Sequence, residues 1–180
     1  MKTALELENQ LVEEAKVNPD KFDLLYEKYF EQIYRYVARR VGDQETQQDL
    51  VSQTFYDALS HLNSYQFRGY PFSAWLYKIA HNNVLKWYRE STKHQQVDLE
   101  EISELRAGDD ITEDLNIKQD EMGIKQLLEK LDYEEQELIK LKYFEEMSNI
   151  EIGVVMGVTA NNVGVKLYRA LKRLKNLMGN

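Results

Sequence analysis

The chain has no cysteine, two proline residues and three histidine residues among its 180 positions. Without cysteine it can form neither a disulfide framework nor a catalytic thiolate, and this composition is typical of cytoplasmic proteins. His61, His81 and His94 are scattered, so no two have the spacing of a metal-binding pair, and each is expected near the surface. The sequence also lacks a glycine-rich phosphate-binding loop. We therefore expect no catalytic residue, no metal site and no cofactor, and an enzyme is not predicted.

Long apolar runs are absent as well. No stretch reaches the roughly 20 apolar residues that a membrane-spanning helix needs, and the acidic segment 1–20 lacks the apolar centre of a signal peptide. These absences predict a cytoplasmic protein without membrane insertion. The scarcity of proline and glycine, together with long stretches of helical periodicity, predicts an all-α fold.

The net charge of −8 is unfavourable for a protein that binds DNA. Most of this excess lies in segment 91–122, which has 10 acidic residues and 3 basic ones. Because this segment also has little apolar surface to bury, we predict a flexible acidic linker. It would join two small helical domains, residues 1–90 and 123–180, each close to neutral.

The pattern of a helix-turn-helix occupies residues 148–177. Ser148 and Glu151 have the spacing of a capping box, Gly157 stands where the chain must turn, and Thr159 can cap the second helix. Apolar residues follow that second helix at helical spacing: Val163, Leu167, Ala170, Leu171 and Leu174. The opposite face is polar and basic, with Asn161, Asn162, Val165, Tyr168, Arg169 and Lys172, and Lys166 at its flank. The pattern is typical of a DNA-reading helix, although a helical hairpin with solvated cations would share it.

Periodicity predicts the other helices. They are expected over about residues 5–17, 22–41, 44–62 and 74–89, followed by a helix capped by Asp132 and Glu135. The first is expected to dock loosely, and Ser73 to cap the fourth. The predicted inner face of the fourth is Trp75, Leu76, Ile79, Ala80, Val84 and Trp87, with Tyr77 and His81 outside or at its margins. In the C-terminal domain the predicted inner residues include Leu138, Ile139, Leu141, Phe144, Ile152, Val155 and Met156.

Aromatic and basic residues gather between the third and fourth helices and along the fourth. Tyr65, Phe67, Tyr70, Tyr77 and Tyr88 have no evident inward role in the periodic pattern, and cations accompany them: Arg68, Lys78, Lys86 and Arg89. Rings beside cations suit single-stranded DNA, because an unstacked base gains roughly 1–3 kcal/mol from stacking on an aromatic side chain. Composition alone favours this interpretation and a packed aromatic cluster equally.

Several motifs resemble those of a known family. Asp49-Leu50-Val51-Ser52-Gln53-Thr54-Phe55 is similar to the D-L-V-Q-E-T-F helix of bacterial RNA polymerase sigma factors. Phe72-Ser73-Ala74-Trp75-Leu76-Tyr77-Lys78-Ile79-Ala80-His81-Asn82 is similar to the helix with which they open and read the minus-ten element, and residues 138–174 resemble region four. From Leu11 onward the chain resembles the small two-domain extracytoplasmic-function group.

The resemblance implies the partners and the residues that meet them. Contacts to the clamp helices of the largest polymerase subunit would come from Asp49, Leu50, Ser52, Gln53 and Tyr56. The minus-ten element would be met by Asn63, Tyr65, Phe67, Arg68, Tyr70, Tyr77, Lys78, His81, Asn82, Lys86 and Arg89. The minus-thirty-five element would be met by Thr159, Asn161, Asn162, Val165, Lys166, Tyr168, Arg169 and Lys172. Core RNA polymerase (clamp helices and flap), promoter DNA and an anti-sigma factor are the expected partners.

Some positions depart from the family pattern. Ser52 and Gln53 stand where Gln and Glu are usual, Asp132 replaces a usual Pro, and Gly164 stands where Lys or Arg is common. The predicted function is a transcription initiation factor that gives polymerase its promoter specificity. A stand-alone helix-turn-helix regulator and a degenerate sigma-like interaction protein are the alternatives. The acidic linker could lie in a basic channel of the polymerase or serve as a solvated tether.

Overall fold

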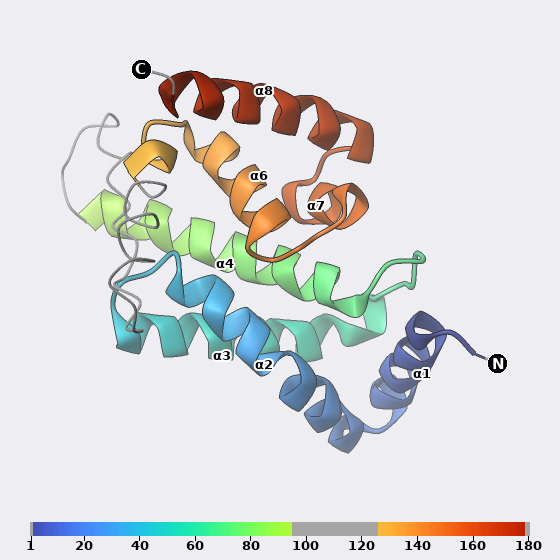
Figure 1. Ribbon diagram of the computed structural model, residues 1–180. Helices are drawn as coiled ribbons and strands as arrows, with labels where there is room; N and C mark the ends of the chain where they lie inside the picture. The colour runs from blue at the N-terminus through green and yellow to red at the C-terminus, as the bar shows by residue number, and fades with distance from the viewer. Residues whose placement is uncertain (1, 95–125, 179–180) are drawn as a thin grey trace, which may run out of the picture. The chain divides into compact units, whose positions relative to one another are not determined.

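The computed structural model describes residues 2–94 and 126–178, which fall into two compact units. We call them the N-terminal unit and the C-terminal unit. Within these ranges all regular structure is helical (Figure 1), so the all-α prediction is confirmed. No helix in either range has the length and apolar character that crossing a membrane requires. The part of the predicted linker from residue 95 onward lies outside the described residues.

The N-terminal unit is built on three helices that lie alongside one another (Figure 1). α2 (Phe22–Ala38), α3 (Gln44–His61) and α4 (Phe72–His94) each contact the other two. Asp43 caps α3 as predicted, because its Oδ2 accepts a hydrogen bond from the Thr46 N–H at 2.8 Å. Apolar side chains of the three helices form one core that includes Leu25, Ile33, Val37, Val51, Ala58, Leu76, Ala80 and Val84.

The first helix, α1 (Ala4–Val17), is firmly docked, so the expectation of loose docking is wrong. Val12 and Ala15 are buried, and a short helix, η1 (Pro19–Lys21), connects α1 to α2. Glu8 also lies on the buried face. A glutamate on the inner face of a helix leads one to expect weak docking. In the structure, however, its carboxylate accepts hydrogen bonds from groups of α2 and α4.

α4 begins and ends differently from the prediction. Its first residue is Phe72, whose N–H donates to Glu8 Oε2 at 2.7 Å, so a carboxylate from α1 takes the role expected of Ser73. At the other end α4 continues to His94, so the segment that starts at residue 91 does not lose helical structure there. Of the predicted inner face, Trp75, Ile79 and Trp87 are only half-buried.

The C-terminal unit contains α6 (Tyr133–Tyr143), α7 (Asn149–Met156) and α8 (Ala160–Met178), preceded by a helical turn at residues 126–128. α8 packs against both α6 and α7. One apolar cluster joins Leu128, Leu131, Ile139 and Ala170 to Leu171, Leu174 and Leu177. The Asp132–Glu135 capping box of α6 is present as predicted. Phe144 is exposed rather than inner, because α6 ends at Tyr143, and Met156 is half-buried.

Candidate nucleic-acid interfaces

A tight turn joins α7 to α8. Ser148 and Glu151 form the predicted capping box at the start of α7, and Gly157 ends the helix with a φ of 71°, a left-handed conformation that glycine adopts without strain. Thr159 Oγ1 accepts from the Asn162 N–H at 3.2 Å, which confirms the predicted cap of α8. Gly153 is also essential to this turn, although nothing in the sequence pattern points to it. A Cβ at that position would stand 2.6 Å from the Val158 carbonyl oxygen, so only glycine allows this approach.

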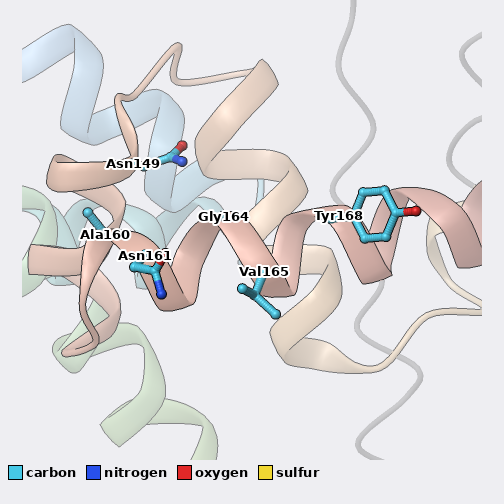
Figure 2. A pocket seen from close by; sticks show the side chains of 6 residues that line it. All are labelled: Asn149, Ala160, Asn161, Gly164, Val165 and Tyr168. Carbon is cyan, nitrogen blue, oxygen red and sulfur yellow. The ribbon is translucent and has the colours of Figure 1, made fainter.

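The outer face of α8 is open to solvent as its periodicity predicts. The predicted stripe is buried at Val163, Leu167 and Ala170, and Tyr168 is 69% exposed. The other predicted contact residues Thr159, Asn161, Asn162, Val165, Arg169 and Lys172 are exposed too. Figure 2 shows a shallow groove along this face, lined by Asn149 of α7 and by Ala160, Asn161, Gly164, Val165 and Tyr168 of α8.

Two cations of α8 are paired with the first turn of α6. Lys166 Nζ makes a short ion pair with Glu134. Arg173 Nη1 lies 2.8 Å from Glu135 Oε2 and 3.7 Å from Asp132 Oδ2. Both cations are partly exposed, so these ion pairs stabilise the unit only modestly. Another anion, such as a phosphate, can therefore replace the carboxylate beside each cation. Lys166, predicted to face DNA phosphate, therefore has an acidic neighbour of its own.

Three predicted contact residues of the N-terminal unit are buried, and the expectation that they face outward is wrong. Tyr65 and Tyr77 are each 4% exposed, and His81 is buried as well. Tyr65 packs edge-on against Phe72 with ring centres 5.1 Å apart. Tyr77 packs in the same way against Tyr36 at 5.2 Å. The Tyr36 hydroxyl is hydrogen-bonded to His81 Nδ1 at 3.0 Å.

The reason is the position of α4 in the unit. α4 contacts both α2 and α3, so more of its circumference is covered than a single apolar stripe suggests. Tyr77 and His81 meet α2 through Tyr36. For Tyr65 the packed aromatic cluster, one of the two alternatives left open by composition, is correct. Burial raises the pKa of the Tyr65 phenol to about 12, as expected for a ring packed inside the unit.

The remaining predicted residues of this region are accessible. We call residues 63–71 the aromatic loop; it begins in η2 (Leu62–Ser64) and turns at Gly69, where φ is 80°. Its exposed members include Asn63, Phe67 and Arg68, and Tyr70 is half-buried. On α4 the exposed predicted residues are spaced at one helical face: Lys78, Asn82, Lys86 and Arg89. An exposed ring and a row of basic and amide side chains thus lie on consecutive segments.

The predicted polymerase-binding face lies on α3. Asp49, Ser52 and Gln53 are exposed, and Tyr56 is 67% exposed. Gln53 Nε2 donates to Asp57 Oδ1 at 2.8 Å, so it is held on the helix surface. Leu50 is largely buried, and it can take part in such a contact only through its edge. Exposed tyrosine is enriched in protein interfaces, and polar groups such as those around Tyr56 are common at their rims.

Two helical units, one of them a helix-turn-helix with an exposed polar face, are typical of DNA-binding proteins of transcription. Comparison with known families agrees and goes further. Residues 25–94 match Sigma-70 region 2, and residues 121–174 match Sigma-70, region 4. The chain belongs to the RNA polymerase sigma factors of the extracytoplasmic-function type, and it is therefore a sigma factor of transcription initiation.

Individual relatives support this assignment. The chain is 33% identical over 162 residues to the RNA polymerase sigma factor YlaC of Bacillus subtilis, covering 88% of this chain and 92% of the relative. It is 31% identical over 176 residues to the ECF RNA polymerase sigma factor BldN of Streptomyces coelicolor, covering 94% of this chain but only 65% of the relative.

Solved structures share the fold. CnrH in complex with the cytosolic domain of CnrY has a TM-score of 0.67 at 24% identity, with 96% of this chain and 97% of that chain covered. RpoE in complex with the anti-sigma factor NepR from Bartonella quintana has a TM-score of 0.67 at 19% identity, with 88% and 96% covered.

Proposed function

We propose that the chain binds core RNA polymerase and directs it to a set of promoters through two separate DNA contacts. The exposed outer face of α8 is the observation that carries this proposal. That face presents amide, aromatic and basic side chains on the second helix of a helix-turn-helix, where such side chains can reach base edges in the major groove.

On the upstream element, the residues of α8 would divide between bases and backbone. Asn161 and Val165 line the groove in Figure 2, so they are suited to contact base edges. Arg169 and Lys172 lie further along the exposed face, where phosphate contacts would fix the orientation of the helix. Lys166 would reach phosphate only after leaving Glu134.

On the downstream element, the aromatic loop and the exposed row on α4 would hold the melted strand. Phe67 is the exposed ring available for stacking on an extruded base, and Arg68 stands beside it. Lys78, Lys86 and Arg89 would follow the strand's phosphates. Tyr65, Tyr77 and His81 are removed from this contact list, because their side chains form the support beneath it.

Polymerase would be held through α3, with Tyr56 as the central exposed ring and Asp49, Ser52 and Gln53 around it. Because RpoE of Bartonella quintana has been captured with an anti-sigma factor, we extend to this chain regulation by a protein of that class. We further propose that the chain acts in the cytoplasm as a non-enzymatic specificity subunit, without cofactor or metal.

The test is transcription from a genomic fragment library with core polymerase of the source organism, with and without the chain. We expect transcripts that need both components and that share two upstream sequence elements. Arg169→Ala should reduce these transcripts about tenfold, because one charge-assisted contact to DNA is lost. Lys21→Ala, which removes a cation from the exposed surface of η1, is the matched control. Absence of any transcript that depends on the chain would refute the proposal.

A further inference from the structure

Both ends of the aromatic loop are attached to α1. At the beginning of the loop, Lys16 Nζ donates to the Tyr65 carbonyl oxygen at 2.9 Å. Just past its end, the Phe72 N–H donates to Glu8 Oε2 at 2.7 Å. Between these two points lie the exposed residues Phe67 and Arg68. A loop whose two ends are fixed has fewer conformations available than one anchored only by its chain neighbours.

The Glu8 carboxylate that holds the Phe72 N–H is also bound to α2. Its other oxygen, Oε1, accepts from Lys28 Nζ at 2.5 Å and from the Tyr29 hydroxyl, both on α2. The carboxylate is buried, so each of these hydrogen bonds is costly to leave unmade. Burial and the neighbouring Glu8 carboxylate raise the pKa of the Tyr29 phenol, in keeping with its role as a donor to Glu8. Glu8 thus joins α1, α2 and the first turn of α4 at one point.

We propose that α1 positions the aromatic loop for capture of an unpaired base, with Glu8 and Lys16 as the positioning residues. This inference rests on the proposed function of the loop. A ring that must meet an extruded base loses affinity if the loop has first to be ordered, and a preformed loop avoids that cost. Neither Glu8 nor Lys16 needs to touch DNA, since both act through the backbone atoms that they hold.

The first measurement is hydrogen exchange of the full chain without DNA or polymerase. In Glu8→Ala and Lys16→Met, amides of residues 65–72 should exchange at least tenfold faster, with protection of α3 unchanged. Gln47→Ala is the matched control, because it removes a buried hydrogen bond to the Val41 carbonyl at 2.6 Å, away from the loop. Lys16→Arg keeps a donor and should exchange as the unmodified chain does. Unchanged exchange at 65–72 in both loop variants would overturn the inference.

The second measurement is promoter opening by the holoenzyme, followed by 2-aminopurine fluorescence on a promoter recovered from the transcription experiment. Lys16→Met should open the promoter about tenfold more slowly, while Lys16→Arg and Gln47→Ala open it at the normal rate. If the unmodified holoenzyme opens no promoter, the proposed function fails. If the unmodified holoenzyme opens the promoter, two results would contradict only the role of α1. One is that Lys16→Met opens the promoter at the normal rate although its loop exchanges faster. The other is that Gln47→Ala opens the promoter as slowly as Lys16→Met does. Lys16→Met keeps the test decisive should Glu8→Ala not fold.

Discussion

At the residue scale, Gly153 and Gly164 both occupy helical positions of the C-terminal unit, but the space around them differs. A Cβ at Gly153 would meet the Val158 carbonyl oxygen at 2.6 Å. At Gly164 the nearest atom outside its own helix turn would be Asn149 Nδ2 at 3.5 Å, an ordinary contact. We expect Gly153→Ala to destabilise the unit by about 1–3 kcal/mol, since backbone must shift. Gly164→Ala, its matched control, should stabilise it by roughly 0.5–1 kcal/mol.

Chemical denaturation of the two variants checks this pair. Equal effects of the two substitutions would contradict the difference in geometry. Gly164→Ala also tests the shallow groove on α8, because the added methyl group narrows it beside Asn161 and Val165. A gain in stability with a loss of promoter binding would indicate that glycine is retained there for DNA contact.

Glu8 makes the stability of the N-terminal unit depend on pH. Burial alone would raise the pKa of Glu8, but hydrogen bonds from Lys28, Tyr29 and the Phe72 N–H outweigh it and lower the pKa below the ordinary value. The charged form therefore stabilises the fold above the ordinary carboxyl pKa, and this contribution is lost as the pH falls through the lowered one.

Glu8→Gln should consequently destabilise the unit near neutral pH by about 1–3 kcal/mol. The difference from the unmodified chain should begin to shrink below about pH 4, where the unfolded chain binds a proton. It should vanish only after the pH has fallen through the lowered pKa of Glu8, where the carboxyl group is protonated in both states. Urea denaturation at a series of pH values measures it. Glu31→Gln removes the same charge from an exposed position of α2, and its effect should be small at every pH. A Glu8→Gln difference that stays constant down to acidic pH would contradict this account.

At the element scale, acidic side chains of α6 compete with DNA phosphate for cations of α8. α8 carries five cations and no acidic residue, and two of those cations pair with the first turn of α6. We expect Glu134→Gln to raise the holoenzyme's affinity for a promoter a few fold at low salt, because Lys166 then has no anion to leave. The plot of log affinity against log salt concentration should steepen by about 0.9, because one further counterion is released when the DNA binds.

Fluorescence anisotropy with labelled promoter DNA at several salt concentrations measures both quantities. Glu129→Gln is the control: it removes the same charge from an exposed residue of the C-terminal unit that is not paired with α8 in the contacts above. A loss of affinity in Glu134→Gln would show instead that Glu134 orients Lys166 toward the phosphate.

The number of neighbours that a helix packs against decides how well the sequence predicts its buried side. α8 packs with one face and leaves the other open, so its periodicity correctly separates Val163 and Leu167 from Tyr168. α4 is covered by α2 and α3 together, so one stripe does not describe it, and Tyr77 appears outward in the pattern although it is buried. The Glu8 contact to Phe72 links positions 64 residues apart. No local pattern contains that contact, and for the same reason the true start of α4 could not be predicted.

At the scale of the whole molecule, each unit has its own apolar core. Ile33 is completely buried in the N-terminal unit, and Ile152 is completely buried in the C-terminal unit. We predict that the two units unfold as separate cooperative transitions, because each buries its apolar surface internally.

Ile33→Ala and Ile152→Ala, the same chemical change in the two cores, should each cost about 2–5 kcal/mol in one transition and leave the other in place. Differential scanning calorimetry of the full chain, with tryptophan fluorescence to report the N-terminal unit, which contains both Trp75 and Trp87, assigns each transition. A single transition lowered by both substitutions would mean that the units stabilise each other. Separate transitions would mean that each unit is stable without the other. A substitution that destabilises one unit would then leave the DNA contact of the other unit intact.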